Sequence, residues 1–247
     1  MSENTVHPGR PSVIVDGVHK RFTLNHALSL KDTVVAWIRR RKLSSTFEAL
    51  KGIDIVIDEG ESVAILGLNG SGKSTLLKLV SGVMEPDEGS VLTRGRVAGL
   101  IEVGAGFHPE LSGRENVYLN AAILGMSRRE IEERYEQIVA FSEIERFIDQ
   151  EVKHYSSGMF MRLAFSVAIH VEVDVLLVDE ILSVGDAPFR EKCRLKFEEL
   201  IAAGKTLVVV SHDLDMVREL CTRGIVISKG EVVFDGDIGA ATELVGS

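Results

Sequence analysis

One loop, Gly67 to Thr75, constrains the fold of this chain more than any other segment. It reads Gly-Leu-Asn-Gly-Ser-Gly-Lys-Ser-Thr and matches the full pattern G-x-x-x-x-G-K-S/T. An apolar strand pattern at Ser62 to Leu66 precedes the loop, and a helical pattern at Ser74 to Ser81 follows it. Because this strand–loop–helix order is the context in which the pattern binds phosphate, we expect an α/β fold with a nucleotide at this loop.

The residue types of the loop suit phosphate chemistry. Its glycines let backbone N–H groups approach phosphate oxygens without obstruction by side chains. Lys73 supplies a catalytic positive charge for the β- and γ-phosphates, Ser74 offers a hydroxyl to Mg²⁺, and the helix that follows adds the positive end of its dipole. The candidate nucleotide-binding residues of the loop are Gly67, Asn69, Gly70, Ser71, Gly72, Lys73, Ser74 and Thr75.

A pair of carboxylates follows a second apolar strand pattern, Val175 to Val178. Such a run is typical of a buried strand in a parallel sheet, and its C-terminal end is where these sheets place ligands. Asp179 can hold Mg²⁺ together with Ser74. Glu180 lies one residue further along and can accept a proton from a water molecule that attacks the γ-phosphate. Together with the phosphate loop, the pair indicates nucleotide hydrolysis.

Two further segments have residue types that bind anions or γ-phosphate. Tyr155-Ser156-Ser157-Gly158-Met159 precedes an apolar helix pattern at Met161 to Ala168, and small residues at a helix start leave backbone N–H groups for an anion. Ser is also an ordinary helix cap, so this segment alone would be ambiguous. Ser211-His212-Asp213 follows the strand pattern Leu207 to Val210 and places a candidate catalytic His212 after a strand.

The order of these motifs resembles the ATP-binding subunit of ABC transporters. The resemblance implies a P-loop NTPase (RecA-like) core with an inserted helical subdomain and an antiparallel β-subdomain. It also implies that Tyr155 to Met159 is the signature segment, that His212 is the switch histidine, and that Ser183 to Asp186 is the D-loop. The implied activity is hydrolysis of ATP to ADP and phosphate, with ATP and Mg²⁺ bound.

Within that family, the chain is most similar to the branch that exports cell-surface polysaccharides of the O-antigen, teichoic acid and capsule types. Gly104 to Asn116, the segment Tyr155 to Met159, and Arg162 to Phe165 carry this likeness. The branch implies that ATP hydrolysis drives transport of a lipid-linked polysaccharide across the cytoplasmic membrane. It also implies a permease subunit in the membrane, and a peripheral location for this chain at the cytoplasmic face.

The chain departs from the family pattern at two places. Ser157 replaces the first Gly of the signature and Met159 replaces its Gln, so the γ-phosphate contact is carried over to Ser156 and Gly158 alone. The usual Gln of the Q-loop is missing, because Val103 stands in its place beside Glu102. Glu102 either takes over a metal or water contact or flanks a loop that contacts the membrane partner, and the sequence leaves both alternatives open.

The chain has one phosphate loop and no internal repeat, so the resemblance implies a head-to-tail homodimer. Each ATP would lie between Gly67–Thr75 of one copy and Ser156, Ser157 and Gly158 of the other. This arrangement has two-fold symmetry and two ATP sites.

Composition supports a soluble nucleotide-binding domain. The length of 247 residues with 45% hydrophobic residues suits one large α/β domain with a helical subdomain. No run of 18 apolar residues and no signal peptide are evident, so we expect membrane contact mainly through the permease. Cys193 and Cys221 are far apart and predicted to be reduced thiols in or near the core. The net charge of −9 argues against nucleic acid as a ligand.

The expected layout assigns residues 1–11 to a flexible N-terminus and residues 12–247 to one nucleotide-binding domain. Residues 12–103 and 172–247 form its catalytic lobe, and residues 104–171 form the helical lobe. The predicted elements are strands at 12–18 and 52–57, two short strands within 90–100, a helical stretch over 116–141, a helix over 188–202, a helix over 214–221, and a hairpin of 225–227 with 231–234. The printed sequence ends soon after this hairpin, so we expect no appended glycan-binding domain.

The segment between Phe22 and Phe47 resembles an insertion. Lys20-Arg21-Phe22 resembles the family's adenine-stacking position, which is an aromatic residue shortly after the first strand, and an aromatic face suits a purine. Phe47 is the alternative, and we favour Phe22. Inside the segment, Leu30, Val34, Trp37 and Ile38 share a helical stripe, and basic residues 39–42 follow it. This pattern predicts either a helix packed on the domain or one near the membrane surface, where Trp and basic residues are favoured.

Two other functions were weighed. A soluble ABC-type ATPase of DNA repair or translation usually has long coiled coils or two ATP domains, and this sequence shows neither. A P-loop kinase is disfavoured by the signature segment and by Ser211-His212-Asp213. The sequence does not identify the polysaccharide, and the direction of transport rests on the resemblance to the export branch.

Overall fold

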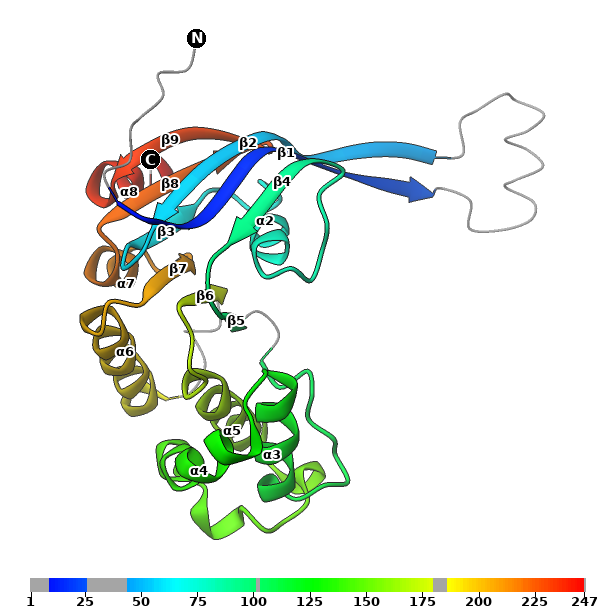
Figure 1. Ribbon diagram of the computed structural model, residues 1–247, viewed down its shortest axis with the longest axis vertical. Helices are drawn as coiled ribbons and strands as arrows, with labels where there is room; N and C mark the ends of the chain where they lie inside the picture. Colours follow the sequence, from blue (N-terminus) through cyan, green and yellow to red (C-terminus); the bar gives the residue numbers. More distant parts are fainter. Residues whose placement is uncertain (1–8, 26–43, 101–102, 180–185, 247) are drawn as a thin grey trace, which may run out of the picture.

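The computed structural model describes residues 9–25, 44–100, 103–179 and 186–246 (Figure 1). The elements in chain order are β1 (Pro11–Asn25), β2 (Ser44–Asp58), β3 (Ser62–Leu66), α2 (Lys73–Val80), β4 (Glu88–Thr93), β5 (Val97–Leu100), α3 (Gly113–Ile123), α4 (Arg128–Ser142), η1 (Glu145–Phe147), η2 (Val152–His154), α5 (Ser157–Ile169), β6 (Val175–Asp179), α6 (Ala187–Ala202), β7 (Thr206–Val210), α7 (Leu214–Leu220), β8 (Arg223–Ser228), β9 (Glu231–Asp237) and α8 (Ile238–Gly246).

A six-stranded sheet with the strand order β5-β6-β7-β3-β8-β9 lies at the centre of the fold. Its first five strands are parallel, and β9 pairs antiparallel with β8. Every residue of β3 and β7 is buried, as expected for inner strands that are covered on both faces. Because parallel strands end at the same edge of a sheet, the segments that follow β3, β6 and β7 meet at one place.

The side chains of β3 alternate between two hydrophobic cores. Val63 and Ile65 face a core that β3 shares with α2 and the second sheet. Ala64 and Leu66 face the other core, which contains side chains of α6, α7 and the helical lobe (α3, α4 and α5). This alternation follows from the two-residue period of a strand, and it fixes the direction in which β3 delivers the chain to the phosphate loop.

The second sheet is antiparallel and has the order β2-β1-β4, which confirms the expected antiparallel β-subdomain. Its strands β1 and β2 are longer than predicted, since they pair from Pro11↔Asp58 to Asn25↔Ser44. The prediction ended the first strand at Val18, but irregular pairing near Gly17, whose φ is 55°, lets β1 continue. The predicted helical stripe Leu30 to Ile38 and the basic residues 39–42 lie outside the described residues.

The stretch Asn116 to Phe141, which was predicted to be helical, forms two helices, α3 and α4. Gly125 adopts a φ of 87°, which breaks the first helix. Ser127 then starts the second helix with a capping box, in which its side chain accepts from the Glu130 N–H and the Glu130 carboxylate accepts from the Ser127 N–H. This Ser-x-x-Glu spacing was present in the sequence and could have located the break.

The C-terminal helix α8 was not predicted. Asp237 ends β9, and its carboxylate accepts hydrogen bonds from the N–H groups of Gly239 (2.8 Å) and Ala240 (3.2 Å). These bonds satisfy donors of the first helical turn, which have no partner inside the helix. The helix packs against β8, where Ala241 is fully buried.

Both cysteines are buried free thiols, as predicted. Burial raises the pKa of the Cys193 and Cys221 thiols to about 12, so neither thiol ionises near neutral pH. In the part of the chain that the structure describes, no helix is both long and apolar enough to cross a membrane.

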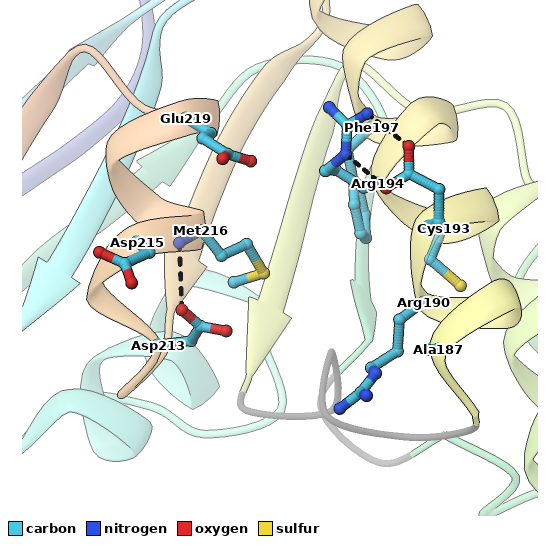
Figure 2. Close-up of a pocket in the computed structure, with 10 residues that line it drawn as sticks. Ala187, Arg190, Cys193, Arg194, Phe197, Asp213, Asp215, Met216 and Glu219 are labelled. Carbon is cyan, nitrogen blue, oxygen red and sulfur yellow. Dashed lines mark hydrogen bonds and ion pairs between the residues drawn. The ribbon is translucent and has the colours of Figure 1, made fainter.

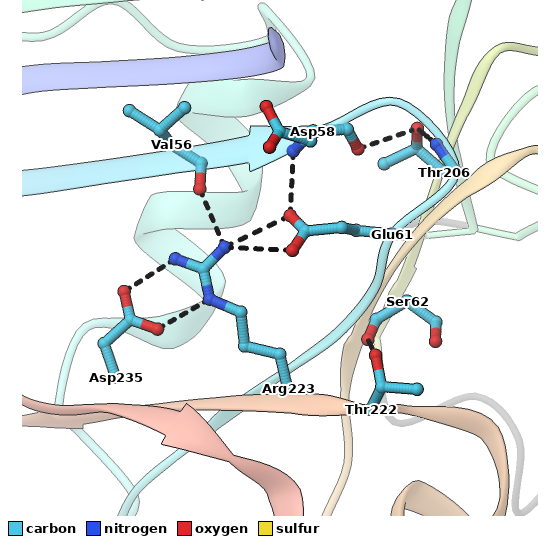
Figure 3. A network of polar contacts seen from close by, with 9 residues as sticks. Val56, Asp58, Glu61, Ser62, Thr206, Thr222, Arg223 and Asp235 are labelled. Carbon is cyan, nitrogen blue, oxygen red and sulfur yellow. Dashed lines mark hydrogen bonds and ion pairs between the residues drawn. The ribbon is translucent and has the colours of Figure 1, made fainter. Parts of the chain in front are cut away.

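The Arg223 guanidinium on β8 joins the two sheets (Figure 3). It donates to the Val56 carbonyl on β2 (2.9 Å), to the Glu61 carboxylate (3.1 Å), and through two nitrogens to the Asp235 carboxylate on β9 (2.6 and 2.7 Å). Only 15% of the Arg223 side chain is exposed. A guanidinium that is shielded from water and paired with two carboxylates holds these elements in one geometry.

Replacing Arg223 with Met is therefore expected to destabilise the protein by about 3 kcal/mol, because the Glu61 and Asp235 carboxylates lose their shared cation. The measurement is urea unfolding. Arg129→Met is the matched control, since Arg129 forms an ion pair with Glu133 while its side chain is 88% exposed. Such surface pairs contribute about 0.5 kcal/mol. A loss in Arg223→Met no larger than in the control would contradict the linking role of this network.

Candidate nucleotide-binding site

The glycines of the phosphate loop are required by the packing of the loop itself. Gly67 has a φ of 143°, and a Cβ there would lie 2.1 Å from the Ile227 carbonyl oxygen on β8. Gly72 has a φ of 115°, and its Cβ would lie 2.8 Å from the Ala49 carbonyl oxygen. Gly70 has open space around it. The approach of phosphate predicts glycines in this loop, and the structure adds backbone contacts that exclude side chains at Gly67 and Gly72.

Two buried polar groups of the phosphate loop, the Lys73 ammonium and the Ser71 hydroxyl, are relevant to phosphate binding. The buried Lys73 ammonium donates to the carbonyls of Gly67 (2.7 Å) and Leu68 (3.1 Å). The buried hydroxyl of Ser71 has no hydrogen-bond partner within the described residues. A loop that gathers an ammonium and an unsatisfied hydroxyl fits a phosphate group, which accepts hydrogen bonds from both.

The helix after the loop also lacks the usual N-terminal cap. Gly72 occupies the cap position of α2 without a side chain, and the first turn contains no acidic residue. By contrast, Ser112, Ser127 and Ser156 cap α3, α4 and α5 with their hydroxyls. The N–H groups of the first turn of α2 are therefore available to a bound anion, which the helix dipole favours.

Three sequence-predicted segments meet at the same edge of the six-stranded sheet. Asp179 ends β6 and lies in register with Val210, the last residue of β7. His212 follows β7, and its Nε2 lies 3.0 Å from the Asn69 Oδ1 of the phosphate loop. A hollow of about 500 Å³ beside this contact is lined by Leu66, Gly67, Leu68, Asn69, Ser211, His212, Leu214 and Val245. Glu180 lies outside the described residues, so the structure does not place its carboxylate.

A second hollow, of about 350 Å³, lies against the phosphate loop. It is lined by Phe22, Phe47, Ala49 and residues 69–75. Phe22 on β1 and Phe47 on β2 are direct cross-strand neighbours. Phe47 is 49% exposed, and the Lys20 ammonium lies 5.9 Å from the centre of the Phe22 ring. Since both rings line the same hollow, the structure does not separate the two predicted candidates for adenine stacking, and the preference for Phe22 stays a prediction.

The signature segment lies in the helical lobe, apart from α2 (Figure 1). The Ser156 hydroxyl caps α5 by accepting from the Met159 N–H (3.2 Å), and Ser156, Ser157 and Gly158 are exposed. Neither hollow that the phosphate loop lines includes these residues. Within one chain, the signature segment and the phosphate loop therefore do not line a common hollow. Val103, at the position of the missing Gln, packs against the core.

Another hollow of about 370 Å³ lies between α6 and α7 and contains none of the sequence-predicted site residues (Figure 2). Its α6 side carries Arg190 and Arg194, whereas its α7 side carries Asp213, Asp215 and Glu219. Carboxylates outnumber cations there, which disfavours a polyphosphate. This hollow is therefore not a candidate nucleotide site, and the phosphate loop stays the candidate.

The fold and the loop define a P-loop nucleotide-binding protein, and comparison with known proteins specifies its family. The ABC transporter family model matches residues 50–183. ABC transporter protein AbcA of Aeromonas salmonicida is 46% identical over 235 residues, which span 92% of this chain and 73% of AbcA. O-antigen export system ATP-binding protein RfbB of Klebsiella pneumoniae is 42% identical over 239 residues, 95% of this chain and 96% of RfbB.

Among solved structures, a dimeric ATP-binding cassette in a post-hydrolysis state, bound to ADP and phosphate, superposes with a TM-score of 0.71 at 26% identity. The match covers 92% of this chain and 98% of that chain. The chain belongs to the ABC transporter family, as the order of its motifs predicted. The expected fold class and the ATPase class of the protein are thereby confirmed.

Proposed function

We propose that this chain hydrolyses ATP to drive export of a lipid-linked cell-surface polysaccharide across the cytoplasmic membrane. The observation that carries the hydrolysis is the meeting of the phosphate loop, Asp179 and His212 at one edge of the sheet. Support for polysaccharide export comes from the O-antigen export relative, which matches over nearly the whole of both chains. The chain would act as a peripheral subunit at the cytoplasmic face.

In this proposal, the loop N–H groups and Lys73 neutralise the β- and γ-phosphates, and His212 holds the γ-phosphate. Ser74 and Asp179 would hold Mg²⁺, which supplies positive charge that stabilises the transferring phosphoryl group. Two protein ligands suit Mg²⁺, because this ion takes few protein ligands alongside phosphate oxygens. Glu180 would accept the proton of the attacking water.

The proposal includes a homodimer, because the exposed signature segment needs a γ-phosphate that its own chain does not bring to it. Ser156, Ser157 and Gly158 of one copy would face the ATP held by residues 67–75 of the other. The dimeric state of the matched ATP-binding cassette supports this arrangement. The proposal also keeps the division into a catalytic lobe (12–103 and 172–247) and a helical lobe (104–171).

An apolar groove of about 440 Å³ supports a membrane-embedded partner. It is lined by Lys78, Ser81, Val83, Val97, Ala98, Gly99, Ile123, Leu124 and Gly125. Val83 is 74% exposed and Ile123 is 61% exposed at its rim. Exposed apolar side chains gathered around a hollow are typical of protein interaction sites. We assign this groove to the permease subunit.

The test is to express the tagged chain in host cells from which its gene is deleted, and to measure permease co-isolation and surface polysaccharide together. Ile123→Glu is expected to abolish both signals, since a charge in the groove opposes an apolar contact, while purified protein still binds ATP. Val233→Glu is the matched control, because Val233 is 59% exposed on β9 and outside the groove. Normal surface polysaccharide in cells without the chain would contradict the export function.

A further inference from the structure

Arg162 on α5 connects the helical lobe to the start of α6. One terminal nitrogen of its guanidinium donates to Glu143 at the end of α4 (2.5 Å), and the other donates to Asp186, the residue before α6 (2.6 Å). The guanidinium also lies 4.8 Å from the centre of the Phe189 ring on α6. One side chain of α5 thus contacts both the end of α4 and the start of α6 through charge and ring contacts.

The surroundings of Arg162 hold it in this position. Its side chain is 18% exposed, while those of Glu143 and Asp186 are 49% and 58% exposed. Lys192 on α6 reinforces the same junction, because its ammonium donates to Glu143 (3.1 Å) and to the Phe141 carbonyl (3.0 Å). Hydrogen bonds from Arg162 lower the pKa of the Asp186 carboxyl, so the pair is charged at neutral pH.

The two residues of the pair lie on different elements. Arg162 belongs to α5, and Ser156, the cap of the same helix, lies six positions earlier in the signature segment. Asp186 is the residue directly before α6. A change in the contact between Arg162 and Asp186 would therefore shift the signature segment relative to α6.

We propose that Arg162 is a positioning residue for ATP hydrolysis, and that its ion pair with Asp186 holds the signature helix α5 against the start of α6. This inference rests on the proposed function, since the role of Ser156 belongs to that proposal. Arg162 does not touch the nucleotide in this account. It acts through the two elements that its guanidinium joins.

The test compares kcat and KM for ATP in the full-length protein with Asp186→Asn, Arg162→Met and the double variant. We expect each single change to lower kcat about tenfold, because small misplacements of a catalytic arrangement have large effects on rate, with KM changed less than twofold. The double variant should lose no more than either single variant, because both changes remove the same interaction. Asp186→Asn removes a charge from a largely exposed side chain, so this variant should fold even where Arg162→Met does not.

The pair Arg114–Asp149 is the matched control. The Arg114 guanidinium donates to the Asp149 carboxylate (2.7 Å) and lies 5.2 Å from the centre of the Tyr135 ring, but all three residues belong to the helical lobe. Asp149→Asn should leave kcat unchanged. An unchanged kcat in Asp186→Asn, additive losses in the double variant, or an equal loss in Asp149→Asn would each overturn the positioning role. Absence of ATP hydrolysis by the unmodified protein would instead contradict the proposed function, and with it this inference.

Discussion

Glu180→Gln is expected to lower the rate of ATP hydrolysis at least about 100-fold while the affinity for ATP stays unchanged, because glutamine cannot accept the proton of the attacking water. The Gln side chain has nearly the same size, so the loop and the Mg²⁺ ligands should keep their arrangement. ATP that is bound and not hydrolysed should then hold two copies together. The measurements are phosphate release, nucleotide affinity and molar mass with Mg-ATP.

Glu172→Gln is the matched control for this variant. Glu172 lies seven residues before Asp179, before the start of β6, and its exposed carboxylate pairs only loosely with Arg134, at 3.5 Å. This change removes the same charge from the opposite end of the strand, so turnover should remain normal. Normal hydrolysis in Glu180→Gln would remove Glu180 from the role of general base.

Gly67→Ala is expected to abolish detectable ATP binding and to destabilise the fold. Its new Cβ would lie 2.1 Å from the Ile227 carbonyl oxygen, so the loop must move away from β8. The left-handed backbone at this position adds strain of about 1–3 kcal/mol. A displaced loop no longer directs its N–H groups at one phosphate, so binding should be lost even in molecules that remain folded. The measurements are urea unfolding and titration with a fluorescent ATP analogue.

Two other glycines separate these effects. Gly89→Ala places a Cβ 2.4 Å from the Asp16 and Gly17 carbonyl oxygens, so it should cost similar stability while the folded molecules keep their ATP affinity. Gly82→Ala imposes only a positive φ of 74° in open space, and it should cost about 1 kcal/mol. If Gly67→Ala bound ATP as tightly as Gly89→Ala, the packing of the loop against β8 would not determine the geometry of the phosphate site.

Much of the fold could be predicted from short stretches of the sequence. The loop at 67–75 and the buried strands were found from the sequence because each depends on neighbouring residues alone. His212 lies at the sheet edge where its place after a strand pattern predicted it, since Ser211 follows the parallel strand β7. The positions of these segments follow from one rule, because parallel strands have their C-terminal ends at the same edge of the sheet.

The features that the sequence did not reveal lie mostly where distant residues decide the structure. The pairing of Phe22 with Phe47 depends on a cross-strand register that no short window of sequence contains. The Arg162–Asp186 pair likewise joins residues that are 24 positions apart and was not predicted. The break at Gly125 is different, because its local signal, a glycine followed by Ser127 and Glu130, was present and was overlooked in favour of helical spacing.

The most direct test of the account is a cross-link between two copies of the chain. Leu68→Cys and Ser157→Cys are introduced separately into the Glu180→Gln protein, and the two variants are mixed with a short bifunctional thiol reagent. Leu68 is 76% exposed in the phosphate loop, whereas the native thiols are buried and should not react. We predict a covalent dimer that forms with Mg-ATP and not with ADP. Failure of the mixture to cross-link while both variants bind Mg-ATP would contradict the claim that one copy's signature contacts the other copy's nucleotide.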